Sequence, residues 1–281
     1  MSEKQQSVEI NTGNDLKYWD TQAQTQLFSS GYKDNIVQLL EWTVLEKSLN
    51  DCLLKLDSDK ANLSFLEIGC HVGFTTQKIH QQAKPKKYDA VDLSQAAIDA
   101  ANEYKNIHGF ADVAFLCASA ASIPIQRGNY DICFAIRCIQ NIQNIQHQID
   151  AFNEIARLTK AGGYFILVEN WLNTNKQLNE IRTISGLVRI DEPRHCKFLD
   201  DDILRPHLST HFEIVDEIHF ASAYYFGTRY AKWLSSAAPV ADLNDAHNKF
   251  YSEIAQDSFR LKLGPSLMVL KKRGVESDNF F

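Results

Sequence analysis

Five short apolar runs, each followed by a stretch with helical spacing, succeed one another in the first two thirds of this chain of 281 residues. The first, SFLEI at residues 64–68, is almost wholly apolar, which is typical of a central parallel strand covered on both faces. The regular alternation predicts an α/β fold with a Rossmann-like, doubly wound and mostly parallel sheet. The five runs end at Ile68, Leu93, Ala118, Ile136 and Glu169.

Beyond residue 170 the alternation breaks. Two later apolar runs, FEIVDEIHF at residues 212–220 and SLMVLKK at residues 266–272, predict two more strands and a sheet of seven. The residues between these strands have helical patterns and an aromatic-rich part, ASAYYFGTRYAKWL. We therefore expect helical lid insertions after strands five and six, at about 170–211 and 221–263.

The same patterns predict one domain over residues 16–273, with polar and flexible ends at residues 1–15 and 274–281. The start, MSEKQQSVEINTGND, lacks the apolar core of a signal peptide. No window approaches the roughly 20 apolar residues that a membrane helix needs. We expect a cytoplasmic protein without a membrane span, whose oligomeric state, monomer or homodimer, stays open.

Charge and cysteine spacing exclude other classes. The formal net charge is −6, and the two short basic clusters, at residues 84–87 and 271–273, are too small for a nucleic-acid face. The six cysteines form no CxxC pair and no zinc-like cluster, so we expect buried, reduced thiols and no metal site. The acidic run at residues 200–202 is interpreted as helix-capping acids rather than metal ligands.

Ligands of doubly wound sheets bind outside the carboxyl ends of the strands. The residues that directly follow the five strands are therefore the candidates for a binding site. They are residues 69–73, Asp92, residues 118–120, residues 137–140 and residues 169–171.

The turn after the first strand has the form E-x-G-x-x-x-G, with Glu67, Gly69 and Gly73. A dinucleotide loop needs G-x-G-x-x-G, because its backbone must approach a pyrophosphate closely. His71 and Phe74 stand where the second and third glycines belong, which argues against a nicotinamide oxidoreductase. A phosphate-binding Walker loop is excluded, since no G-K-[ST] follows.

In this loop and in several later motifs the chain resembles the class I S-adenosylmethionine-dependent methyltransferases, over roughly residues 18–272. Asp92 closes the second strand as the ribose-binding acid of that family does. CASAASIPI, GNYDICFAI and KAGGYFILVE are similar to its third, fourth and fifth motifs. The resemblance implies S-adenosylmethionine as cofactor. The implied cofactor-binding residues are Tyr18, Trp19, Glu67, Gly69, Cys70, His71, Gly73, Asp92, Leu93, Ser119, Ala120 and Arg137.

Three positions depart from the family or leave a choice open. Ser119 replaces the usual adenine-contacting aspartate, so the adenine contact is expected to be weaker or to come from backbone. Arg137 either reaches the methionine carboxylate or an anionic substrate, or forms a structural salt bridge. The side chain of His71 is expected near the methionine end of the cofactor or the lid, facing solvent or acceptor.

The second half is similar to a bacterial branch of these methyltransferases that is associated with surface polysaccharide and lipopolysaccharide biosynthesis. Arg194 and Cys196 depart from that branch, where Trp and Asn flank the histidine. The residues that match are Asn179, Arg182, Gly186, Leu187, His195, Phe198, Tyr224, Tyr225 and Arg229.

This resemblance implies O-methylation of a small polar or sugar-type acceptor in surface glycan biosynthesis. His195 is the candidate general base, because imidazole titrates near neutral pH. Arg182 and Arg229 would bind an anionic acceptor, or would instead hold the lid to the core. Alternatives are N-methylation of an amino sugar or other small amine, and a non-catalytic cofactor-binding module. The candidate acceptor residues are Asn170, Arg182, Tyr224, Tyr225 and Arg229.

Overall fold

The computed structural model describes residues 13–25, 34–56, 62–126, 128, 130–235, 251–253 and 261–274. The predicted flexible ends fall largely outside these residues. Among the described helices, none combines the length and the apolar character that crossing a membrane requires.

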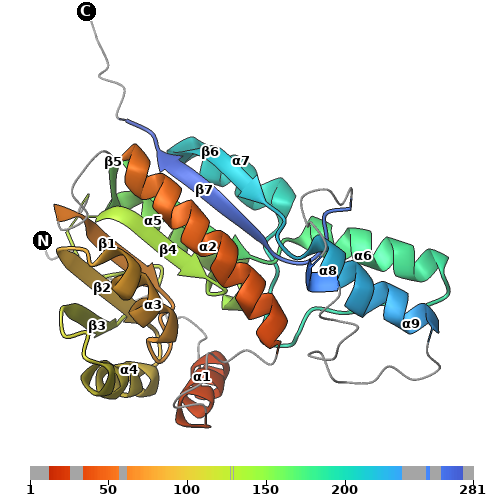
Figure 1. Cartoon of the computed structure of the whole chain (residues 1–281), viewed down its shortest axis with the longest axis horizontal. Coiled ribbons are helices and arrows are strands. Elements are labelled where there is room, and N and C mark those ends of the chain that lie inside the picture. The colour runs from red at the N-terminus through yellow and green to blue at the C-terminus, as the bar shows by residue number, and fades with distance from the viewer. Residues whose placement is uncertain are drawn as a thin grey trace, which may run out of the picture.

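A seven-stranded sheet runs through the centre of the molecule, in the order β3-β2-β1-β4-β5-β7-β6 (Figure 1). Strands β1 to β5 pair in parallel, and β7 is antiparallel to both β5 and β6. This confirms the predicted fold class. The strands are β1 (Ser64–Ile68), β2 (Lys87–Asp92), β3 (Val113–Cys117), β4 (Tyr130–Ile136), β5 (Thr159–Glu169), β6 (Phe212–Ile218) and β7 (Ser266–Lys272).

Helices cover both faces of the sheet, because successive strand residues point to opposite sides. Phe65 belongs to a core cluster with α2, α3 and α4, whereas its neighbour Leu66 belongs to a second cluster with α5 and α7. These helices are α2 (Asn35–Lys55), α3 (Phe74–Ala83), α4 (Gln95–His108), α5 (Ile145–Leu158) and α7 (Asp201–His211).

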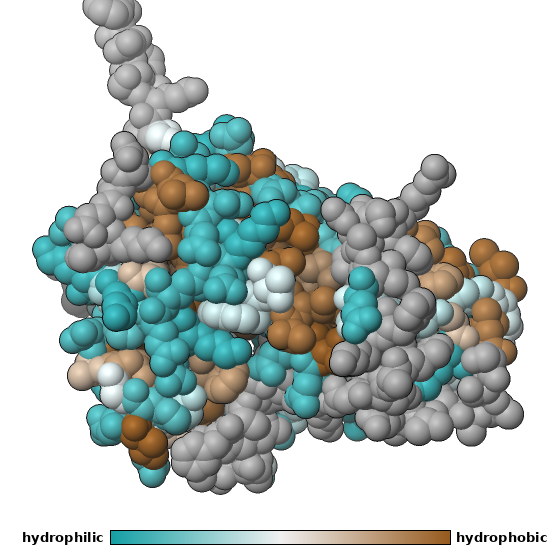
Figure 2. Space-filling view, in the orientation of Figure 1, coloured by the Kyte–Doolittle hydropathy of each residue, from teal (hydrophilic) through white to brown (hydrophobic). Residues whose placement is uncertain are grey.

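The lid helices lie together beyond one end of the sheet (Figure 1). They come from the two segments expected to form insertions, 170–211 and 221–263. The end of the first segment differs from the prediction, because α7 packs in the core beside α5. Exposed apolar side chains of Ile184, Val188 and Leu234 belong to this part of the molecule, and Figure 2 shows a largely polar face beside it. The lid elements are α6 (Leu172–Ile184), α8 (Ser222–Phe226), the π-helical η3 (Gly227–Ala231) and α9 (Lys232–Ser235).

Helix starts follow the capping residues of the sequence. Ser94, a residue type favoured at helix N-caps, accepts a hydrogen bond from the Ala97 amide at the start of α4. Asp200 caps α7 in the same way, through the amide of Asp202, which confirms the interpretation of the acidic run.

Local details differ from what residue spacing indicates. The isoleucines of the stretch 139–159 have the spacing of one amphipathic helix, but the structure divides it: η2 (Ile139–Asn141) has its C-cap at Ile142, and Asn144 then caps α5. Strand β5 begins at Thr159, directly after α5 ends at Leu158. Of the six cysteines, all free, Cys117 is exposed rather than buried.

Candidate functional site

A cavity of about 620 Å³ opens at the carboxyl ends of β1, β2 and β4. Its volume lies within the range of roughly 300–1,000 Å³ that is typical of small-molecule sites. It brings together the predicted base, His195, and eleven of the twelve predicted cofactor residues. Gly73 is the exception, since it does not line the cavity.

The glycine loop is held by its backbone and by close packing. The amides of Gly69 and Cys70 both donate to the carbonyl of Val91, and Gly69 has a φ of +80°. A Cβ at Gly69 would lie 2.5 Å from both Cβ and Sγ of Cys138, which follows β4. Gly73 has a φ of +83° and caps α3. Both glycines are therefore required by the protein itself, before any ligand is considered.

Glu67 is buried at the end of β1, within the cavity lining. One carboxylate oxygen accepts hydrogen bonds from the hydroxyls of Thr76, at 2.6 Å, and Tyr88, at 2.8 Å. Burial raises the pKa of Glu67 to about 7, although both hydroxyls favour the charged form. Glu67 thus connects β1 to α3 and to β2 through hydrogen bonds of its side chain.

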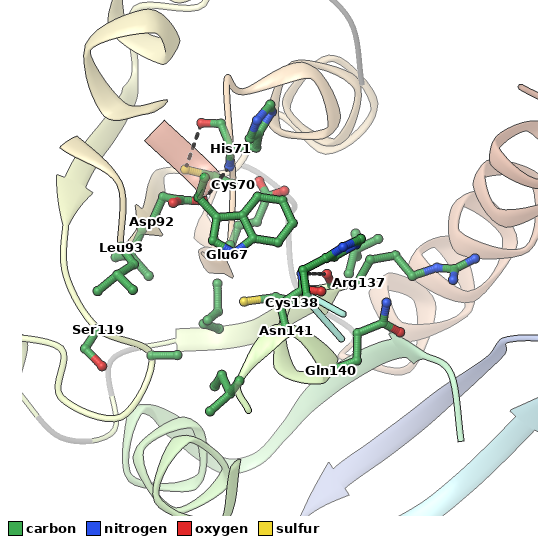
Figure 3. A pocket seen from close by; sticks show the side chains of 18 of the residues that line it. Glu67, Cys70, His71, Asp92, Leu93, Ser119, Arg137, Cys138, Gln140 and Asn141 are labelled. Atoms are coloured by element: carbon green, nitrogen blue, oxygen red, sulfur yellow. Dashed lines mark hydrogen bonds between the residues drawn. The ribbon is translucent and has the colours of Figure 1, made fainter. Parts of the chain in front are cut away.

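Asp92 ends β2 and faces the glycine loop (Figure 3). Its two oxygens accept one backbone hydrogen bond each, from the amide of His71 at 2.9 Å and that of Ser94 at 3.0 Å. Each oxygen retains acceptor capacity for a ligand. Burial raises the pKa of Asp92 and lowers that of the nearby His71. The structure thus places His71 beside Asp92, with a φ of +48°.

Arg137 follows β4 with its side chain turned toward α2 (Figure 3). Its Nε lies 2.7 Å from Oε2 of Glu41, and the two side chains are only 14% and 6% exposed. Its backbone has a φ of +54°, in the left-handed region. This geometry favours the structural salt bridge over the ligand contact, although Arg137 also lines the cavity.

The wall after β4 is held from behind by Glu169, the last residue of β5. Its buried carboxylate accepts hydrogen bonds from the amides of Cys138, Ile139 and Gln140. Burial nevertheless raises the pKa of Glu169 to about 8. The backbone turn at the cavity edge therefore depends on a side chain from the neighbouring strand.

The loop that carries His195 is fastened to this turn. The Gln140 carbonyl accepts from the amide of Lys197 at 2.6 Å. Buried Gln148 donates through Nε2 to the carbonyls of Ile139, Ile142 and Lys197, at 3.3, 3.0 and 2.9 Å. The position of His195 thus depends on a residue of α5 that is remote in sequence.

The His195 ring meets two aromatic residues of α1 (Gly13–Thr25). It stacks on Tyr18, with centroids 4.8 Å apart and planes inclined by 15°, and meets the Trp19 ring edgewise at 5.9 Å. All three line the cavity. The structure therefore places the predicted base against the predicted cofactor aromatics.

The predicted acceptor residues do not line the cavity, and most of them join the lid to the rest of the molecule. Arg229 lies 3.0 Å from Asp34, the N-cap of α2, and stacks over Tyr225. The Tyr224 hydroxyl also donates to Asp34, at 3.0 Å. Buried Arg182 donates to the carbonyls of Val188 and Arg229. These contacts favour the alternative that both arginines hold the lid.

Asn170 also lies outside the cavity lining, where its backbone and side-chain amides both donate to Oε1 of Gln140. Other polar residues, outside the positions that the sequence singled out, do line it. One of them, Asn144, has the residue type of a helix N-cap, which is a signal visible in the sequence. These additional polar lining residues are Gln22, Thr75, Asn141, Gln143, Asn144, His147 and Cys196.

Residues 66–167 match the model of a family described as a methyltransferase domain. A curated relative, the uncharacterized methyltransferase YcgJ of Bacillus subtilis (strain 168), is 24% identical over 145 residues. That similarity spans 52% of this chain and 54% of YcgJ, so the chain covers about half the length of this relative. Both findings support the prediction of a class I methyltransferase.

Solved structures share the fold at low identity. A geranyl diphosphate C-methyltransferase from Streptomyces coelicolor A3(2), in complex with Mg²⁺, geranyl diphosphate and S-adenosyl-L-homocysteine, superposes with a TM-score of 0.58 at 14% identity, over 92% of this chain and 97% of that one. The [4+2]-cyclase SpnF gives 0.52 at 18% identity, over 76% and 75%. The fold is therefore shared with proteins of different activities.

Proposed function

We propose that this chain is an S-adenosylmethionine-dependent methyltransferase that acts on a small polar acceptor. One observation carries the proposal: the cavity at the strand ends joins the glycine loop, Asp92 and Ser119, within the residues that match a methyltransferase domain. When bound, the cofactor supplies an electrophilic methyl group on a sulfonium. The side chains of the protein bind the cofactor and the acceptor and orient them toward each other.

The residues present fit this cofactor. Both oxygens of Asp92 retain acceptor capacity, as a carboxylate that binds two ribose hydroxyls needs. Tyr18 and Trp19 offer aromatic faces on which a cation is stabilised. Residues 118–121 line the cavity in the segment that resembles the adenine-binding motif.

His195 is the proposed general base. It lines the same cavity as Asp92 and stacks on Tyr18, so its ring is held by packing. An acceptor hydroxyl must lose its proton as the new bond forms, which an imidazole near neutral pH can accept. An amine acceptor needs only to arrive neutral, so N-methylation would not require His195.

The finer proposal is O-methylation of a sugar-type acceptor in surface glycan biosynthesis. Its support is the similarity of the lid segments to that bacterial branch. The competing function is one without methyl transfer, because a [4+2]-cyclase shares this fold.

Cofactor binding is the first test, measured by calorimetry and thermal melting with S-adenosylhomocysteine. A ligand at 100 times its Kd should stabilise the fold by about 2.7 kcal/mol. Asp92→Asn should weaken binding about 10- to 100-fold, since hydrogen bonds to a charged group contribute about 1.5–3 kcal/mol. Asp99→Asn, on the exposed side of α4, is the matched control and should bind normally. A melt that shifts with NAD but not with S-adenosylhomocysteine would contradict the proposal.

Turnover tests the base. His195→Ala should lower kcat about 10²- to 10⁴-fold with a hydroxyl acceptor, and leave S-adenosylhomocysteine affinity within a few-fold. The acidic limb of the pH profile should disappear with the imidazole. Unchanged turnover and an unchanged pH profile would show that another group, or an amine acceptor, is involved.

A further inference from the structure

Resting on the proposed function, we infer that the acceptor is uncharged where it enters the cavity, and is recognised by amide and aromatic groups rather than by arginines. The first support is the charge of the lining. Among the described residues that line the cavity there is one arginine and no lysine, against two carboxylates, Glu67 and Asp92.

That arginine is already neutralised. Arg137 pairs with Glu41 at 2.7 Å, and both side chains are largely buried. To bind an anionic acceptor, Arg137 would have to leave a carboxylate behind without its partner, which is costly at a site so shielded from water. The guanidinium of Arg137 thus already takes part in a structural ion pair.

The arginines that the sequence suggested for an anionic acceptor are committed as well. Arg229 pairs with Asp34 beneath the lid. Arg182 is buried, and its guanidinium donates to two backbone carbonyls and stacks against Trp233. Neither residue lines the cavity. Among the described lining residues, an acceptor phosphate or carboxylate would find no arginine or lysine other than Arg137, which is paired with Glu41.

The wall after β4 offers neutral hydrogen-bonding groups instead. Asn141, Gln143 and Asn144 bring three amides to the lining, and His147 and His195 bring imidazoles (Figure 3 shows the part around Asn141). Two of these amides also have structural partners: Asn141 donates to the Arg137 carbonyl, and Oδ1 of Asn144 caps α5. The Gln143 side chain is exposed at the rim, and no hydrogen bond holds it among the described residues. Amides of this kind donate to and accept from hydroxyls and carbonyls without requiring a charge.

The aromatic side of the cavity fits the same class. Tyr18 and Trp19 also line the cavity, where their rings meet the His195 ring. Ring surface packs well against the apolar face of a sugar or another neutral ring, while an anion is repelled by the negative face of the π-system. A hydroxyl-bearing neutral acceptor therefore satisfies both sides.

The test uses S-adenosylmethionine with a deuterated methyl group and a bacterial small-molecule extract, split by anion exchange into retained and unretained fractions. Binding of S-adenosylhomocysteine is measured first, because failure to bind would contradict the proposed function itself. With a binding-competent chain, we expect the unretained fraction to yield at least tenfold more labelled product. Label confined to the retained anions would overturn the inference and leave the proposed function intact.

A charge placed at the rim sharpens the test. Gln143→Lys should move the ratio of labelled product about 5- to 10-fold toward the retained anions, because it supplies the missing cation. Gln81→Lys is the matched control: it adds the same charge at an exposed position of α3 that does not line the cavity, and its ratio should equal that of the native chain. An equal response of both variants, or of neither, would contradict the assignment of this wall to the acceptor.

Discussion

The two walls of the cavity differ in what gives them their form. The wall after β1 and β2 is shaped by backbone: Gly69, His71 and Gly73 all have positive φ, and Asp92 ties the loop through backbone amides. The wall after β4 is shaped by side chains, since Glu169 and Gln148 hold the turn and the His195 loop through backbone groups. Substitutions in the first wall should therefore destabilise the protein through steric strain. Substitutions in the second wall should act through the loss of hydrogen bonds or of a charge.

The largest effect is expected where the two walls touch. Gly69→Ala would place a Cβ 2.5 Å from Cβ and Sγ of Cys138, at a φ of +80°. Overpacking and left-handed strain together should lower the free energy of unfolding by about 2–5 kcal/mol. Urea denaturation measures this.

Gly109→Ala separates strain from overpacking. Gly109 has a φ of +71°, but a Cβ there would meet nothing within 4 Å. It should cost only about 1–2 kcal/mol. Adding Cys138→Gly to Gly69→Ala should recover part of the loss. Equal costs for the two alanine variants would show that the contact between the walls contributes nothing.

The same contrast explains why the first wall could be predicted from the sequence and the second could not. The first wall follows from local signals, because Gly69 and Ser94 act within a few residues of where they stand. The parallel direction of the first five strands followed from their alternation with helices. The second wall rests on partners far along the chain: Glu169 lies 30 residues from Ile139, and Gln148 lies 49 from Lys197.

Charged residues were the least predictable, since a sequence does not show which partner they meet. Arg182 and Arg229 have the residue type that an anionic acceptor needs, yet Arg182 donates within the lid and Arg229 pairs with Asp34 at the start of α2. The sequence allowed Arg137 either a ligand contact or a structural salt bridge, and the position of Glu41 on α2 favours the salt bridge. No spacing rule connects positions 96 residues apart.

A pH series tests the buried acid of the first wall. Burial raises the pKa of Glu67 from 4.5 to about 7, so the folded state binds a proton that the unfolded state has already lost. The stability that this protonation contributes is complete below the unfolded pKa and is lost as pH rises through about 7.

Glu67→Gln removes the titration while keeping an oxygen that accepts from Thr76 and Tyr88. Between pH 5 and pH 8 the variant should lose less unfolding free energy than the native chain, by an amount on the order of 3 kcal/mol. Urea denaturation at each pH measures the difference. Glu46→Gln, on the exposed side of α2, should follow the native curve. Parallel curves for Glu67→Gln would show that Glu67 is charged in the folded state throughout this range.

The ion pair behind the second wall should couple more strongly than a surface pair. A double-mutant cycle with Arg137→Gln and Glu41→Gln should give a coupling of about 2–3 kcal/mol, reduced from the value of a wholly buried pair because 14% of the arginine side chain is exposed. The Lys160–Asp131 pair, whose lysine is 42% exposed, should give at most about 1 kcal/mol. A coupling as small as that of the surface pair would remove the argument that Arg137 is committed to the fold.

A smaller loss of stability than at Gly69, and one specific to the second wall, is expected at Gln148. Gln148→Ala deprives three carbonyls of one buried donor and should lower the free energy of unfolding by about 2 kcal/mol. Because one of those carbonyls belongs to Lys197, the variant should also lower kcat more than it alters S-adenosylhomocysteine affinity. Gln146→Ala, an exposed position on the same helix, should change neither quantity. If Gln148→Ala weakened cofactor binding as much as turnover, the two walls would not be separable, and the His195 loop would belong to the cofactor site as well.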